Sequence, residues 1–203
     1  MLQDKYFWLG FASLLINLIG YIPYIRGIFK DTVKPQRITW GIWAILTSVA
    51  FTNQVKNGGG YSTLFFGSTM FLVITVFLLS LKRGVGGKSK FDLFVLTASI
   101  VLFFLWAVTQ DTRTTTVIAV AIDLFAALPT LYKSYIQPET EAYLQWILAA
   151  VAGLLSMLAV GVSTDYILFI YPLYIIIMNT LVVLAKFVGT KINSAKKLSV
   201  HQT

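Results

Sequence analysis

The sequence predicts an all-α polytopic membrane protein with seven transmembrane helices, built as two parallel three-helix repeats joined by a connector helix. Three observations predict this fold: an apolar composition, seven apolar segments between short polar breaks, and prolines that recur in register. Of the 203 residues, 57% are hydrophobic and 12% are charged, and the mean hydropathy is +0.78. Soluble domains are about a quarter charged, so the composition argues against a soluble domain.

Each apolar segment has about 19 to 24 residues, enough to cross a hydrocarbon core of about 30 Å. Backbone groups in lipid must be satisfied within the segment, which favours helices. The first segment is expected to be a retained helix, because Pro23, Tyr24 and Arg26 follow its apolar run instead of a small-residue cleavage pattern. The expected helices span residues 6–29, 37–55, 61–81, 91–109, 114–135, 140–162 and 166–188.

The breaks between the segments are polar or rich in glycine. Residues 57–60 separate the second and third segments, and the glycine-rich stretch 82–88, expected to be a flexible loop, precedes the fourth. The weakest break is residues 161–165, between the sixth and seventh segments. The chain is therefore expected to divide into a first repeat (1–82), a connector helix with its loops (83–113), a second repeat (114–188) and a basic tail (189–203).

Basic residues are distributed unevenly between the two ends of the predicted helices. Thirteen of the sixteen lysines and arginines follow odd-numbered helices, and only Lys5, Lys56 and Arg113 lie on the other side. The positive-inside rule then places the amino terminus outside and the carboxyl terminus in the cytoplasm, and we expect the cell membrane to be the location. The basic tail is expected to contact anionic lipids of the cytoplasmic leaflet.

An internal repeat is indicated by four of the five prolines. Pro23 and Pro35 flank the first loop on the basic side, and Pro129 and Pro138 flank the third. Aligning the two halves on these prolines pairs Asn17 with Asp123, Trp43 with Trp146 and Tyr61 with Tyr166. Repeats four helices apart have the same orientation in the membrane, as in the parallel-repeat design of some secondary transporters.

The segments Gly20–Lys30, which reads GYIPYIRGIFK, and Ala127–Lys133, which reads ALPTLYK, resemble the PQ-loop segments of the SWEET-like transporter superfamily. The three-one-three helix order and the external amino terminus are similar to that superfamily over nearly the whole chain. One departure is that Tyr24 and Thr130 stand where the family has glutamine after each proline. The Trp40-Gly-Ile-Trp43 segment is loosely similar to the tryptophan-rich PnuC-type vitamin transporters.

Asp123 is the candidate site residue that carries most information, since it falls near the middle of the fifth predicted helix. A charged carboxylate at the bilayer midplane is costly unless it is paired, hydrated or protonated. One interpretation is that Asp123 binds a cationic group or a proton while Asn17, at a similar depth, supplies an amide hydrogen bond. The alternative is a structural role, with Asp123 bonded to hydroxyls such as those of Thr116 or Thr130.

Three further side chains are candidates for substrate binding. Trp43 and Trp146 occupy equivalent positions, and an indole suits stacking against a sugar or base ring. Tryptophans also fill bundle cores and form interfacial belts, and Trp40 is expected to be a belt residue. The resemblance places a substrate-contacting asparagine in the seventh helix, where Asn179 lies; a packing hydrogen bond is the alternative.

The paired prolines have a mechanical interpretation. Pro23 and Pro129 each remove a hydrogen bond inside a helix and favour a kink, so they are candidate hinges of an inner gate. Pro35 and Pro138 are expected to begin the second and sixth helices. Static kinks are the alternative for the first pair.

A membrane carrier for a small polar solute is the function that these features favour. Sugars, amino acids and vitamin nucleosides all suit aromatic walls with Asn and Asp, and transport is expected by facilitated diffusion or proton coupling. A seven-helix receptor, sensor or scaffold is the alternative. An intramembrane enzyme is less favoured, because no cysteine and a single histidine, His201, are present. We expect no catalytic residue, metal, cofactor or nucleic-acid partner, and an oligomer is compatible with the design but not required.

Overall fold

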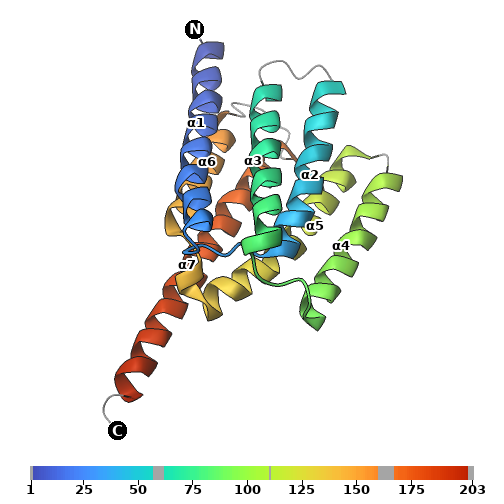
Figure 1. Cartoon of the computed structure of the whole chain (residues 1–203). Coiled ribbons are helices and arrows are strands. Elements are labelled where there is room, and N and C mark those ends of the chain that lie inside the picture. Colours follow the sequence, from blue (N-terminus) through green and yellow to red (C-terminus); the bar gives the residue numbers. More distant parts are fainter. Residues whose placement is uncertain (1, 57–61, 110, 160–166, 201–203) are drawn as a thin grey trace.

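The computed structural model describes residues 2–56, 62–109, 111–159 and 167–200, and this part of the chain is all-helical. Seven α-helices run roughly side by side as a bundle, with the amino terminus at one end (Figure 1). A short 3₁₀ turn, η1, precedes α6. The elements are α1 (Leu2–Phe29), α2 (Arg37–Lys56), α3 (Ser62–Arg83), α4 (Lys90–Val108), α5 (Thr112–Ile136), η1 (Pro138–Thr140), α6 (Tyr143–Ala159) and α7 (Ile167–Val200).

Four of the described helices contain a segment long and apolar enough to cross a membrane: 6–29, 90–108, 113–136 and 173–195. A shorter apolar stretch, 143–155, lies in α6. Large apolar side chains also cover the outside of the bundle, with Phe71 67% and Phe104 66% exposed. Large exposed apolar surfaces are rare on soluble monomers, so these features indicate a membrane protein.

Three of the expected helix boundaries are wrong. The first helix begins at Leu2 and not at residue 6. The sixth helix begins at Tyr143 and not at residue 140, because Pro138–Thr140 forms the 3₁₀ turn and Glu141 is extended. The seventh continues to Val200, twelve residues beyond the expected end. Alanine, lysine and leucine in 189–200 favour a helix in water as well as in lipid, so the change in polarity does not end it. The expected tail is therefore largely helical, and α7 projects beyond the bundle (Figure 1).

Helix packing brings the two halves of the chain together. α1 packs on α6 and α2 packs on α5, while α3 contacts α1 and α2, and α7 contacts α5 and α6. The connector α4 packs on α5 and, less extensively, on α2. Interhelical hydrogen bonds support this packing: Ser13 Oγ donates to the Ala152 carbonyl at 2.8 Å, and Thr39 Oγ1 donates to the Ala126 carbonyl at 2.5 Å.

The caps of α4 and α5 are formed by side chains at their amino-terminal ends. Ser89 and Asp92 form a reciprocal capping box at the start of α4. At the start of α5, the Asp111 carboxylate accepts hydrogen bonds from the Thr114 hydroxyl and from its backbone N–H, both at 2.7 Å. These bonds lower the pKa of Asp111, so the cap persists at neutral pH and is lost only as the pH falls through that lowered value.

The α3–α4 loop was expected to be flexible, but it is fitted closely around Gln36. Gly86 has a φ of +79°, which favours glycine, and a Cβ on it would lie 2.2 Å from the Gln36 amide nitrogen. That amide donates to Asp92 at 2.7 Å. Loop 84–89 is thereby held against loop 30–36 by specific contacts.

Replacing Gly84 by alanine should destabilise the protein by about 1–3 kcal/mol, the usual cost of overpacking. A Cβ on Gly84 would lie 2.4 Å from the Ser80 carbonyl oxygen and 2.5 Å from that of Pro35, both of them backbone atoms. Gly10→Ala is the matched control, since nothing lies within 4 Å of its Cβ position. The midpoint of thermal unfolding in detergent should fall for Gly84→Ala only, and equal midpoints would contradict the packing described for this loop.

Candidate functional site

Five aromatic side chains from α1, α2 and α6 form a cluster in the interior of the bundle. Trp43 is the partly buried member, and Trp40 is only 1% exposed, so its expected place in an interfacial belt is wrong. Ring centroids of Trp40 and Trp43 are 5.2 Å apart, and those of Trp43 and Trp146 are 6.1 Å apart. We call Tyr21, Tyr24, Trp40, Trp43 and Trp146 the aromatic cluster.

The two tryptophans paired in the sequence alignment, Trp43 and Trp146, meet in this cluster. Trp43 enters from α2 and Trp146 from α6, and the helices that carry them pack on α5 and α1 respectively. Trp43 also packs against a second group of apolar residues centred on Val95, Ile122 and Ala126. The tryptophan pair predicted from the alignment is therefore brought together at the junction of the two halves.

Asp123 lies beside the aromatic cluster and is 5% exposed. Its Oδ1 accepts hydrogen bonds from Trp43 Nε1 at 2.5 Å and from the Tyr174 hydroxyl at 3.0 Å. These two hydrogen bonds join α5 to α2 and to α7. Thr130 was one expected structural partner, but its hydroxyl donates to Thr39 at 3.0 Å instead.

Asn17 and Asn179 are not joined to Asp123. The Asn17 side chain is partly buried and forms no hydrogen bond within the described part of the chain. Asn179 is 8% exposed, and its Nδ2 donates to the Ile175 carbonyl of its own helix at 2.7 Å. Both remain candidates by position only.

Two buried polar atoms of the aromatic cluster lack a hydrogen bond of ordinary geometry among the described residues. They are the Tyr24 hydroxyl and Trp40 Nε1, on side chains that are 0% and 1% exposed. Buried polar groups are normally satisfied, and each exception calls for an explanation. The Tyr24 hydroxyl lies beside both the Trp40 indole N–H and the Glu141 carboxylate, so these two donors face each other and a buried acceptor.

A buried ion pair lies at the basic end of the bundle, the end with loops 30–36, 84–89 and 137–142. Lys133 of α5 binds the Glu141 carboxylate, and their side chains are 5% and 0% exposed. Trp146 Nε1 donates to the other oxygen of Glu141 at 3.1 Å. The ion pair is therefore in direct contact with the aromatic cluster.

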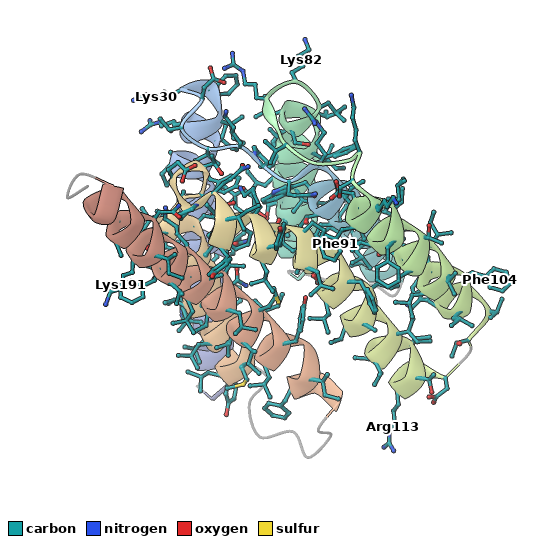
Figure 2. The ribbon with its side chains drawn as sticks, turned by 90° about the horizontal axis from the view of Figure 1, so that it is seen from below. Lys30, Lys82, Phe91, Phe104, Arg113 and Lys191 are labelled. Carbon is teal, nitrogen blue, oxygen red and sulfur yellow. The ribbon has the colours of Figure 1, made fainter. Side chains whose placement is uncertain are left out.

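Lys186 binds this same region from α7. Its Nζ donates to the Pro138 carbonyl and lies 4.5 Å from the centroid of the Tyr143 ring. By contrast, Lys30, Lys82 and Lys191 point away from the bundle when it is seen from this end (Figure 2). Lysines that look alike in the sequence thus divide into surface charges and buried structural partners.

The two prolines proposed as hinges lie inside continuous helices, Pro23 in α1 and Pro129 in α5. Each lines a hollow at the basic end. An open groove of about 470 Å³ beside Pro23 is lined by α1, Thr32 and Leu144. A hollow of about 520 Å³ beside Pro129 is lined by parts of α4, α5 and loops 30–36 and 84–89.

Neither Pro35 nor Pro138 is the first residue of the α-helix that it was expected to begin. Pro138 is the first residue of η1 and not of α6, and Pro35 lies two residues before α2, which begins at Arg37. Tyr61 and Tyr166, also paired in the alignment, lie outside the described residues.

Sequence reasoning did not single out Lys133, Glu141 or Tyr174. One signal was available for the ion pair, since Lys133 falls inside an apolar segment and Glu141 follows only eight residues later. An ionisable residue inside a membrane segment is expected to have a partner. No comparable signal pointed to Tyr174, one of ten tyrosines.

A metal site has no support in the described part of the chain, where no group of three histidine, cysteine, aspartate or glutamate side chains is found. Comparison of the chain with protein families, with curated proteins and with solved structures found no significant match.

Proposed function

We propose that this chain is a seven-span membrane carrier of the SWEET-like, three-one-three layout, which moves a small polar solute by alternating access. The observation that carries the proposal is the buried Asp123 carboxylate, bound by Trp43 and Tyr174 beside an aromatic cluster where the two halves meet. Buried ionisable groups in membrane helices are costly and mark substrate and ion pathways.

The helix contacts support the two-repeat part of the proposal. Exchanging α1, α2 and α3 with α5, α6 and α7 maps each contact between these helices onto another observed contact. The α1–α6 contact becomes α5–α2, α2–α3 becomes α6–α7, and α1–α3 becomes α5–α7. The connector α4 lies outside this exchange. A pseudo-twofold axis along the membrane normal has this property, and in such carriers the solute site lies between the repeats.

The chemistry of the aromatic cluster limits the solute class. Indole and phenol rings offer flat apolar faces, and the buried Tyr24 hydroxyl lies beside the Trp40 indole N–H and the Glu141 carboxylate. Asp123 binds the Trp43 indole, and Glu141 binds the Trp146 indole. Lys133 balances the charge of Glu141, so the buried Asp123 carboxylate is the group that disfavours an anionic solute. A neutral or cationic solute with a ring or several hydroxyls fits best. Sugars, nucleosides and amino acids meet this description, whereas nucleotides and phosphosugars do not.

The aromatic rings contact one another, so the solute enters only when the two halves separate. Separation of repeats around a fixed site is the movement that alternating access requires. The hollows beside Pro23 and Pro129 leave space for α1 and α5 to move, and the two prolines are at equivalent positions in the sequence alignment. We expect transport to run down a gradient or to be coupled to protons.

A ligand screen tests the proposal. The purified protein in detergent is heated with individual sugars, nucleosides and amino acids, and with the corresponding phosphorylated compounds as matched anionic controls. A neutral or cationic solute should raise the unfolding midpoint, since a ligand that binds only the native state stabilises it. The same solute should then enter proteoliposomes that contain the protein. Stabilisation by the phosphorylated compounds alone, or binding without any uptake, would contradict the proposal.

A further inference from the structure

The Lys133–Glu141 ion pair joins the two halves of the chain at the basic end. The Lys133 ammonium donates to the Lys34 carbonyl at 2.7 Å and to the Thr140 carbonyl at 3.4 Å, besides binding Glu141. The backbone N–H of Lys34 donates to the Thr140 carbonyl at 2.9 Å. One ammonium group thus ties loop 30–36 of the first half to loop 137–142 of the second.

Glu141 extends this connection into the aromatic cluster. One carboxylate oxygen binds Lys133, while the other accepts from Trp146 Nε1 at 3.1 Å and from the Ala142 backbone N–H at 3.3 Å. Trp146 packs against Trp43, whose own indole N–H binds Asp123. A continuous series of contacts therefore runs from the loops of the basic end to the proposed solute site.

A buried ion pair is a poor way to gain stability alone, because the desolvation of two charges offsets their attraction. A buried ion pair does, however, have two distinct low-energy states. In one state the two charges are in contact inside the protein, and in the other they are separated and each is hydrated. Two discrete states are what a gate requires.

We propose that Lys133 and Glu141 form the cytoplasmic gate of the carrier, and that Glu141 acts as a positioning residue that links closure of this gate to the Trp146 indole. This inference rests on the proposed carrier function. In the closed state the ion pair holds loops 30–36 and 137–142 together and fixes Trp146 against Trp43. When the pair separates, the loops part and Trp146 is released, which opens the aromatic cluster to the cytoplasm.

The absence of cysteine allows a direct test of gate opening. Ala127 is fully buried in the same core as the aromatic cluster, and cysteine is a small replacement for it. Ala127→Cys is introduced alone, with Glu141→Gln, and with Glu139→Gln, a control that removes an exposed carboxylate two residues away. Inside-out vesicles are treated with the membrane-impermeant thiol reagent methanethiosulfonate ethyltrimethylammonium, and the labelling rate of the introduced thiol is measured.

Glu141→Gln should increase the labelling rate by about tenfold or more, a factor within the usual range of conformational coupling. Glu139→Gln should leave the rate unchanged. Equal rates in the two variants would overturn the gate. The labelling needs no transported solute, so failure of the gate can be distinguished from failure of the carrier function, which would appear as wild-type protein that takes up nothing.

A disulfide between loops 30–36 and 137–142 provides a second test, which is needed if Glu141→Gln fails to fold. Lys34→Cys and Thr140→Cys place two thiols on adjacent backbones. Under oxidant the double variant should lose uptake while solute still raises its unfolding midpoint, and a reducing agent should restore uptake. Either single variant, treated identically, should transport throughout. Full uptake by the verified cross-linked protein would overturn the proposal.

Discussion

Lys133→Met should lower the free energy of unfolding by about 3–5 kcal/mol, the usual cost of removing one member of a buried ion pair. The variant leaves the Glu141 carboxylate buried without its cation and removes the donor to the Lys34 carbonyl. For a chain of this size we expect the unfolding midpoint to fall by roughly 10 °C. Thermal unfolding in detergent, followed by tryptophan fluorescence, measures the effect.

Lys30→Met is the matched control, since Lys30 is exposed at the same end of the bundle. Surface substitutions usually change stability by no more than about 0.5 kcal/mol. The double variant Lys133→Met with Glu141→Met should be more stable than Lys133→Met alone, because it removes the unpaired charge as well. A double variant that is less stable than Lys133→Met would contradict this prediction, because it would show that Glu141 keeps a compensating partner after Lys133 is removed.

Asp123→Asn should weaken solute binding by about tenfold to a hundredfold while leaving the fold intact. An asparagine oxygen can still accept hydrogen bonds from Trp43 and Tyr174, so the packing of α2, α5 and α7 is retained. What is lost is a charge-assisted hydrogen bond to the solute, worth about 1.5–3 kcal/mol. The measurements are the Kd of the solute found by the ligand screen and its KM for uptake into proteoliposomes.

Asp111→Asn provides the control for Asp123→Asn. Asp111 is an exposed residue that caps the amino-terminal end of the same helix, and asparagine caps a helix about as well as aspartate. Wild-type Kd and KM in Asp123→Asn would show that Asp123 only holds the helices together. If Asp123 carries a proton in each cycle, uptake by Asp123→Asn should also lose its dependence on pH, whereas Asp111→Asn should keep it.

The sequence was sufficient to predict the helices because the information needed for them is local. An apolar run of the right length must satisfy its backbone hydrogen bonds internally, so the expected segments and the described helices agree closely at most ends. The three larger differences have one cause: the predicted helix ends were placed where polarity changes, and α1 begins four residues before that change. At α6 a 3₁₀ turn occupies the expected first turn, and at α7 the helix continues past the change.

The site residues were only partly predictable. Trp43, Trp146 and Asp123 could be found from the sequence, because equivalent positions in a repeat and a carboxylate in an apolar helix are visible without coordinates. Their partners could not be found in this way. Whether the Asp123 carboxylate binds Thr130 or Trp43 depends on how α2 is rotated against α5, and the sequence does not fix that rotation.

The sequence by itself determined that this chain is helical and apolar, and it determined where most of its helices lie, since both follow from hydrogen bonding and burial within one segment. Only the tertiary structure decided which lysines are surface charges and which are buried. Lys133 and Lys30 occupy similar places in the sequence, since each follows a proline near the end of a helix. Lys133 meets Glu141 and two carbonyls from other segments, whereas Lys30 is exposed. Those contacts join residues from both halves of the chain, so they exist only once the helices have packed.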